Sequence, residues 1–255
     1  MNSSLPPLDM HAHVDVGIPT SEIDGLQAAV FAMTRSLDEA SRALKRQDRA
    51  AVWGVGCHPG LLQAQRAFST AEFEKLVELT AFVGELGLDG KSSVPMDLQR
   101  RTLDGALAPL EEHPRIVSIH SYGATREVLE ILASRRIKGA ILHWWLGDSV
   151  ETRQAIDLGC FFSVNASTIR RDTILASIPI DRLLTETDHP FGDRYSRGPR
   201  RPGAVADVES AVARAHGLTA SDVRLHVWRN LRRLATETST SRLLPRLLVD
   251  HLTAA

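Results

Sequence analysis

Short apolar runs alternate with longer amphipathic segments along almost the whole chain. Eight runs have the length and hydrophobicity of buried strands: residues 7–12, 26–33, 51–57, 81–87, 116–120, 139–144, 160–165 and 182–187. Segments with helical spacing lie between and after them: residues 36–48, 70–79, 96–112, 125–135, 149–158, 169–177, 204–216, 219–236 and 243–252. Several of these segments open on Ser, Thr or Asp, which cap helix N-termini. The pattern predicts repeated βα units.

Eight strands are the number that closes a parallel barrel, and 255 residues is an ordinary length for one such unit. The chain shows no repeat of solenoid period, and its one clearly irregular stretch is the Arg-, Pro- and Gly-rich segment 194–203. We therefore expect an α/β fold of the (β/α)8 TIM-barrel type, with residues 1–255 forming a single domain.

Composition narrows the class of protein. The net charge is −1, so any nucleic-acid partner would be held by a local site rather than by a general basic field. The two cysteines, Cys57 and Cys160, lack metal or disulfide spacing and fit a reducing compartment. The N-terminus lacks a signal-peptide pattern, and no apolar run is long enough to cross a bilayer. We expect a cytoplasmic protein without a membrane partner.

Ionisable residues gather where the predicted strands end. His11 and His13 stand two positions apart, so both imidazoles can point to the same side of a strand. The other residues that end or follow a strand are His58, Glu85, His120, His143 and Asp188. In a barrel these ends meet at the rim where active sites are built. Neutral imidazoles together with carboxylates favour a divalent metal site, because the cation offsets the clustered negative charge.

The motifs that carry these residues occur in a recognisable order: Asp9-x-His11-x-His13-x-Asp15, Gly56-x-His58-Pro59, Gly84-Glu85-x-Gly87-Leu88-Asp89, His120-Ser121, His143 and Glu186-Thr187-Asp188-x-Pro190. Together they resemble the TatD family of metal-dependent deoxyribonucleases, among the amidohydrolase-type barrels. The resemblance runs from residue 8 to about residue 235 and includes Asn230-Leu231 near its end.

The resemblance implies two divalent ions, Mg, Mn or Zn, and hydrolysis of phosphodiester bonds. One ion would be bound by His11, His13, Glu85 and Asp188, and the other by Glu85, His120 and His143. Glu85 would bridge the two. Glu186 and Asp9 would lie beside the metals, or Glu186 would bind a further ion.

The expected catalytic residues are Asp188, Glu85 and His58. A metal pair can both activate water and stabilise the oxygens of an in-line displacement at phosphorus. Asp188 is the best candidate to orient or deprotonate that water. His58 would bind the phosphate or protonate the leaving oxygen; alternatively it is a turn residue before the rigid Pro59.

The chain departs from the family pattern beside the second predicted ion. Trp144 and Trp145 follow His143 where the family usually has smaller residues, and we expect one packed and one exposed tryptophan that stacks nucleobases. Arg194 and Arg197, with Arg200 and Arg201, add positive charge after Asp188, as phosphate contacts or as a solvated loop.

The expected function is a metal-dependent deoxyribonuclease acting on single-stranded DNA ends. The Trp-Trp and His-Ser-Tyr-Gly variants are similar to TatD-like proteins of Qat-type antiphage operons, which implies protein partners from such an operon. Two alternatives remain open. One is another metal-dependent hydrolase, such as a D-aminoacyl-tRNA deacylase or an ester or amide hydrolase. The other is a metal-bound partner subunit of a defence complex with little turnover of its own.

Overall fold

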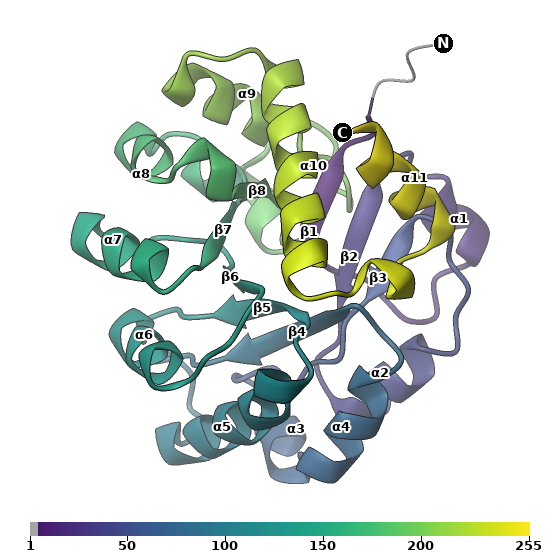
Figure 1. The fold of residues 1–255 in the computed structure, drawn as a ribbon, viewed down its shortest axis with the longest axis vertical. Coiled ribbons are helices and arrows are strands. Elements are labelled where there is room, and N and C mark those ends of the chain that lie inside the picture. Colours follow the sequence, from purple (N-terminus) through teal and green to yellow (C-terminus); the bar gives the residue numbers. More distant parts are fainter. Residues whose placement is uncertain (1–4) are drawn as a thin grey trace.

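The computed structural model describes residues 5–255, in which parallel strands form a ring and helices surround it (Figure 1). All eight predicted strands occur, and the (β/α)8 order is confirmed. Most are shorter than predicted: β1 (Leu8–His13), β2 (Ala29–Met33), β3 (Ala51–Trp53), β4 (Phe82–Gly87), β5 (Ile116–His120), β6 (Ala140–Leu142), β7 (Phe161–Val164) and β8 (Leu183–Thr185). Nearly every strand residue is buried, as expected for a parallel sheet with both faces covered.

The outer helices follow the strands in turn. They are α1 (Thr20–Asp24), α2 (Leu37–Ala43), α3 (Leu62–Ala67), α4 (Thr70–Val77), α5 (Met96–Glu112), α6 (Thr125–Ser134), α7 (Ser149–Asp157), α8 (Asp172–Ser177), α9 (Ala206–His216), α10 (Ala220–Glu237) and α11 (Arg246–Ala254). Four 3-10 turns complete the described residues: η1 (Ala166–Thr168), η2 (Ile180–Arg182), η3 (Gly192–Tyr195) and η4 (Ser241–Leu243).

Two helix starts use the predicted capping residues: Ser36 caps α2, and Thr219 forms a capping box at α10. At α7 the capping box is formed by Asp148, one residue before the predicted start. The sequence did not predict α1 and α3, which have five and six residues and no side-chain cap. Such short helices have little periodicity of their own, so their packing against the barrel decides them.

The ring consists of two hydrogen-bonded arcs, β1-β2-β3 and β4-β5-β6-β7-β8. One isolated parallel bridge, Val55 with Val83, connects the arcs on the β3 side. Strand β3 ends early because Gly54 and Gly56 lie against neighbouring backbone: a Cβ at Gly56 would stand 2.1 Å from the Thr34 carbonyl oxygen. This close approach brings the residues after β3 next to β4.

On the other side, β8 meets β1 mainly through residues at the strand ends. The Asp188 N–H donates to the His11 carbonyl at 2.8 Å, and the His13 N–H donates to the His189 carbonyl at 2.9 Å. Helix α10 packs against both strands and covers this seam (Figure 1). Its Asn230 amide donates to the Ile180 and Leu183 carbonyls, both at 2.8 Å. Asn230, part of the family resemblance, therefore helps to close the barrel.

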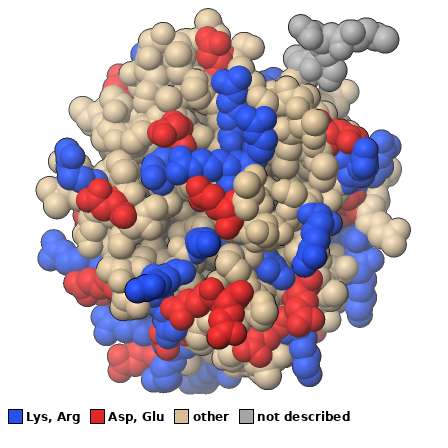
Figure 2. All heavy atoms as spheres, viewed as in Figure 1, with Lys and Arg blue, Asp and Glu red and all other residues tan. Residues whose placement is uncertain are grey.

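Charged side chains of both signs are interspersed over the face on which α10 lies (Figure 2). This agrees with the net charge of −1 and with the expectation that any nucleic acid is held locally. Among residues 5–255, no helix combines the length and hydropathy needed to cross a membrane.

Candidate metal centre

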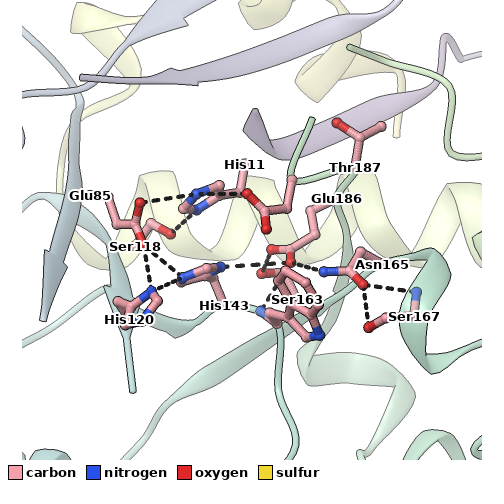
Figure 3. A network of polar contacts seen from close by, with 12 residues as sticks. His11, Glu85, Ser118, His120, His143, Ser163, Asn165, Ser167, Glu186 and Thr187 are labelled. Atoms are coloured by element: carbon pink, nitrogen blue, oxygen red, sulfur yellow. Dashed lines mark hydrogen bonds and ion pairs between the residues drawn. The ribbon is translucent and has the colours of Figure 1, made fainter. Parts of the chain in front are cut away.

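Six of the predicted site residues converge at the C-terminal rim of the barrel. His11 and His13 belong to β1, Glu85 to β4 and His120 to β5, while His143 and Asp188 follow β6 and β8 by one and three residues. We call these six residues the ligand cluster. Figure 3 shows four of them, with the imidazoles of His11, His120 and His143 directed toward the Glu85 carboxylate. Short strands that end in polar residues place all six around one point.

Glu85 lies at the centre of the cluster and faces two groups of imidazoles. Its Oε1 is 2.6 Å from His120 Nδ1 and 3.0 Å from His143 Nε2. Its Oε2 is 3.7 Å from His11 Nε2 and 3.3 Å from His13 Nε2. Each carboxylate oxygen therefore belongs to a different set of nitrogen atoms.

Asp188 completes the second of these sets. Its Oδ1 lies 3.7 Å from His11 Nε2 and 3.5 Å from His13 Nε2. Two atoms that bind one ion, each at about 2.1 Å, stand roughly 3.0–3.5 Å apart in octahedral or tetrahedral geometry. The separations on both sides of Glu85 are close to this range.

Several buried side-chain atoms of the ligand cluster have no hydrogen-bond partner. They are His11 Nε2, Glu85 Oε2, Asp188 Oδ1, His13 Nδ1, His120 Nε2 and His143 Nδ1. A buried polar atom without a partner costs free energy. The first three face one another in the set described above, so the residues present fit a bound cation.

The charges of the cluster also favour a cation. Burial raises the pKa of Asp188 well above its usual value, whereas burial lowers the pKa of His11 to about 3. Burial would also disfavour charge on His143 and Glu85. The Glu85 charge nevertheless raises the pKa of His143, and the neighbouring His58 and His143 lower that of Glu85. Without a cation, only neighbouring histidines can balance the Glu85 charge.

His58 points at the same carboxylate from the loop after β3, with Nε2 at 3.4 Å from Glu85 Oε2. Its Nδ1 accepts a hydrogen bond from the Gly60 N–H at 2.9 Å, so a neutral ring carries its proton on Nε2. Three candidate ligand triplets occur among the described residues, and one groups His58 with Glu85 and His120. A protonated Nε2 has no lone pair for a metal, so we assign His58 as a donor instead.

Glu186 is fully buried and hydrogen-bonded on both oxygens (Figure 3). Its Oε1 accepts from the Trp144 N–H at 3.0 Å and the Asn165 amide at 2.9 Å, and Oε2 accepts from the Ser163 hydroxyl. Burial raises its pKa, but the nearby His143 ring and the Ser163 hydroxyl lower it overall. Glu186 Oε1 also stands 3.7 Å from His143 Nδ1, so it orients this imidazole from behind.

Asp9 is likewise buried and saturated. Its oxygens accept hydrogen bonds from the Thr187 N–H at 2.8 Å, the Thr187 hydroxyl at 2.6 Å and the Gly203 N–H at 2.8 Å. Burial raises its pKa to about 6 despite these contacts. Asp9 therefore fixes the backbone between Glu186 and Asp188. We call Asp9, Ser163, Asn165, Glu186 and Thr187 the supporting network.

Sequence reasoning missed several polar partners. Ser118 Oγ lies 2.8 Å from His11 Nδ1, and Asp89 Oδ2 lies 3.7 Å from His120 Nε2. Ser163 and Asn165 were missed as well. A signal existed, because Ser118 precedes His120 by two positions and Ser163 precedes Asn165 by two, so each pair shares one face of its strand.

The two tryptophans differ. Trp145 is 0% exposed, packs on Phe162 with ring centroids 5.1 Å apart, and donates to the Thr152 hydroxyl at 2.9 Å. Trp145 is therefore the packed tryptophan, and substrate binding by Trp145, which was also considered, is excluded because its side chain has no accessible surface. Trp144 is half-buried rather than exposed and has φ 44°, as does Asp188. Two strained residues beside one cluster are typical of functional sites.

Several contacts hold the predicted irregular loop, residues 194–203, against the rest of the protein. Arg197 N–H donates to Asp207 at 2.6 Å, and Arg200 Nε lies 3.5 Å from the buried Asp193. The Arg194 guanidinium lies over the Tyr195 ring, 5.3 Å from its centroid. Among the described hydrogen bonds and ion pairs, neither Arg194 nor Arg197 contacts the ligand cluster. Their phosphate contacts stay a prediction.

Comparison with known proteins gives one consistent family. The profile of the family described as TatD related DNase matches residues 8–236. An uncharacterized metal-dependent hydrolase of Bacillus subtilis, YabD, is 28% identical over 167 residues, covering 62% of this chain and 66% of the relative. The 3′-5′ ssDNA/RNA exonuclease TatD of Erwinia tasmaniensis is 27% identical over 229 residues, covering 82% and 88%.

The alignments vary in extent: with three of the curated relatives they span 66%, 45% and 50% of the relative's length. Among solved structures, the TatD homolog YJJV from Escherichia coli K12 has a TM-score of 0.79 at 22% identity, covering 89% of this chain and 96% of that one. This likeness supports the barrel fold.

Proposed function

We propose, from the premise that this chain belongs to the TatD related DNase family of metal-dependent hydrolases, that it is a deoxyribonuclease using two divalent ions. The substrate is DNA with a single-stranded end, and the reaction is hydrolysis of a phosphodiester bond. The proposal keeps residues 1–255 as one catalytic unit.

The two-sided position of Glu85 is the observation that carries the proposal. Its Oε1 belongs with His120 and His143, and its Oε2 with His11, His13 and Asp188. A single ion would not need both sets. Mixed nitrogen and oxygen ligands suit Zn or Mn, and Mg is the third candidate. Ions at both positions would supply Lewis acidity to the phosphate and lower the pKa of a water molecule.

Asp188 and His58 are the residues that handle protons. Asp188 Oδ1 is buried and unpartnered within the cluster, so it can accept a hydrogen bond from the attacking water and orient it toward phosphorus. The His58 Nε2–H points toward the Glu85 carboxylate from the loop after β3. It can donate to a phosphate oxygen or to the oxygen that leaves when the P–O bond breaks.

Single-stranded DNA is preferred because the cluster lies within the mouth of the barrel. His11, Glu85, His143 and Asp188 are all buried, and a scissile phosphate near the end of a single strand can approach buried groups more readily than one within an intact duplex. The Erwinia relative is named a 3′-5′ ssDNA/RNA exonuclease, which supports this choice and adds RNA as a substrate to test.

Purified protein tests the proposal with Mg²⁺, Mn²⁺ or Zn²⁺ on labelled single-stranded DNA, duplex DNA, RNA and D-aminoacyl-tRNA. We expect nucleotide release from single-stranded DNA, prevented by EDTA. A His58→Gln variant should retain metal binding and lose roughly 10²- to 10⁴-fold in kcat, as removal of a general acid does. Deacylation of the tRNA without DNA cleavage would favour the alternative hydrolase.

The antiphage role and its protein partners remain predictions from the Trp144-Trp145 and His120-Ser121-Tyr122-Gly123 variants. Plaque counts on cells that carry the native operon, with the wild-type or the Glu85→Gln chain, address that role. Protection that survives Glu85→Gln would favour a partner subunit without turnover.

A further inference from the structure

Large apolar side chains are exposed mainly on the loops and helix starts that follow the barrel strands. Among residues 5–255, the exposed ones are Leu61, Leu79, Tyr122, Leu146, Val150, Phe191 and Tyr195. Only Leu79, at the end of α4, lies away from the loops or helix starts that follow a strand's C-terminal end. We call Leu61, Tyr122, Leu146, Phe191 and Tyr195 the apolar rim. Exposed apolar groups gathered in one place mark an interaction site.

The rim is tied to the site by sequence position. Leu61 follows His58 by three residues, Tyr122 follows His120 by two, Leu146 follows His143 by three and Phe191 follows Asp188 by three. The same loops that carry the cluster therefore also carry the rim. In a barrel, such loops border the approach to the site at the C-terminal ends of the strands.

Phe191 is the rim residue in direct contact with the cluster. Its ring meets the His13 ring edge-on, with centroids 5.4 Å apart and planes at 81°, yet half of the side chain (50%) remains exposed. The Phe191 N–H donates to the Asp188 carbonyl at 2.7 Å, which fixes the backbone. A held aromatic ring with an open surface is suited to stacking.

Tyr122 stands on the far side of the ring of strands. It follows β5, which in an eight-strand ring lies opposite β1, where Phe191 packs on His13. Tyr122 is 56% exposed, and its carbonyl accepts from the Gly90 N–H at 2.8 Å, which holds the loop. Two hydrogen-bonded loops on opposite sides of the ring of strands thus each carry an exposed aromatic residue.

We propose, as a refinement that rests on the proposed function, that Phe191 and Tyr122 stack the nucleobases on the two sides of the scissile phosphodiester. Every base offers a π-face, so stacking binds nucleic acid without reading its sequence. Arginines near Phe191, including Arg194 and Arg200, complement the phosphate chain. An interior base can stack on a protein side chain only after it leaves the duplex stack, so the rim makes the enzyme selective for single strands.

An abasic oligomer, which has the sugar-phosphate backbone but no bases, distinguishes a role in stacking from a role in catalysis. Metal-loaded protein is given oligo(dT) and an abasic oligomer of the same length, and kcat/KM is measured for both. Phosphorothioate versions, which resist cleavage, give Kd by fluorescence anisotropy. Phe191→Ala or Tyr122→Ala should weaken oligo(dT) binding roughly fivefold to a hundredfold and leave the abasic oligomer unchanged. Phe191→Trp should restore binding.

Leu79→Ala is the matched control, because it removes an exposed apolar group away from the rim. It should change neither oligomer. Equal losses on both oligomers, or no loss on either, would overturn the stacking role. Wild-type protein that cleaves both oligomers equally also overturns it, while leaving the nuclease function intact. Tighter binding of oligo(dT) with no cleavage would instead refute the nuclease function alone.

Discussion

The ligand cluster and the supporting network are both buried and both contain carboxylates, but they differ in how many of their polar atoms have a hydrogen-bond partner. In the supporting network, every oxygen of Asp9 and Glu186 accepts from a protein donor. In the ligand cluster, Glu85 Oε2, Asp188 Oδ1 and His11 Nε2 have none. The network is complete without a ligand, whereas the cluster is complete only with a cation. The network thus contributes to folding and holds in place a cluster that contributes to chemistry.

The largest expected effect, and the strongest test of this difference, comes from removing the negative charge of Glu85. Glu85→Gln keeps the shape but removes the charge that both ion positions share. We expect kcat/KM to fall by roughly 10³-fold or more, and both ions to be lost. The free energy of unfolding of the metal-free variant at pH 8 should stay within about 1 kcal/mol of wild type, because its histidines can shed their protons.

Urea unfolding in EDTA, beside a nuclease assay, measures both quantities. A large loss of stability in metal-free Glu85→Gln would show that the cluster supports the fold as the network does. The comparison would then fail.

Adding metal should supply the partner that the ligand cluster lacks and should therefore stabilise the folded protein. A ligand that binds only the folded state at 100 times its Kd stabilises it by about 2.7 kcal/mol. Wild-type protein with excess Mn²⁺ or Zn²⁺ should therefore unfold at higher urea than in EDTA, and Glu85→Gln should not respond. An equal response in both proteins would place the bound ions elsewhere.

A change in the network should affect stability and metal affinity together. In Glu186→Gln the new NH₂ group faces the N–H groups of Trp144 and Asn165 or the Ser163 hydroxyl, so one donor loses its acceptor. We expect a loss of about 1–3 kcal/mol and a metal affinity weaker by roughly 10- to 100-fold. Titration calorimetry and urea unfolding measure these effects.

The exposed Glu130→Gln is the control for Glu186→Gln and should change neither quantity. If Glu186→Gln weakens metal binding without any loss of stability, Glu186 acts on the ions directly, and the distinction between the two regions must be redrawn.

The sequence predicted the cluster far better than the network. A metal site needs particular residue types at strand ends, so His11, His13, Glu85, His120, His143 and Asp188 were visible in the pattern. Ser163 and Asn165 are ordinary polar residues whose importance depends on contact with Glu186, 21 to 23 residues away. Such contacts follow from the closed ring and not from local spacing.

The fold, too, was predictable in some features and not in others. Hydrophobic runs located all eight strands, but strand ends and short helices depend on tertiary packing. Gly54 and Gly56 end β3 through close backbone contact with β2 and β4, and Trp144 takes a left-handed conformation that no periodicity reveals. The exposure of the tryptophans could not be predicted, because the direction of Trp144 and Trp145 depends on that turn.

The smallest expected effect on stability comes from the two cysteines. Burial raises the pKa of both Cys57 and Cys160 to about 12, against 9.0 for an unperturbed thiol. A folded pKa above the unfolded value means full stability below pH 9.0 and a loss as pH rises from there toward 12. At pH 9.0 half of each unfolded thiol is ionised, a loss of about 0.4 kcal/mol per thiol (RT ln 2).

The loss should be absent from a Cys57→Ala, Cys160→Ala double variant, measured as the difference in unfolding free energy between pH 8.0 and 9.0.

The labelling rates of the same two thiols can distinguish opening of the ligand cluster from opening of the supporting network. The Cys57 N–H donates to the Glu85 carbonyl at 2.9 Å, so local opening at Cys57 disturbs the ligand cluster, whereas Cys160 precedes β7 of the supporting network. Bound metal should therefore slow iodoacetamide labelling of Cys57 more than that of Cys160. Equal slowing would mean that both thiols react only through global unfolding, so that cluster and network open as one unit.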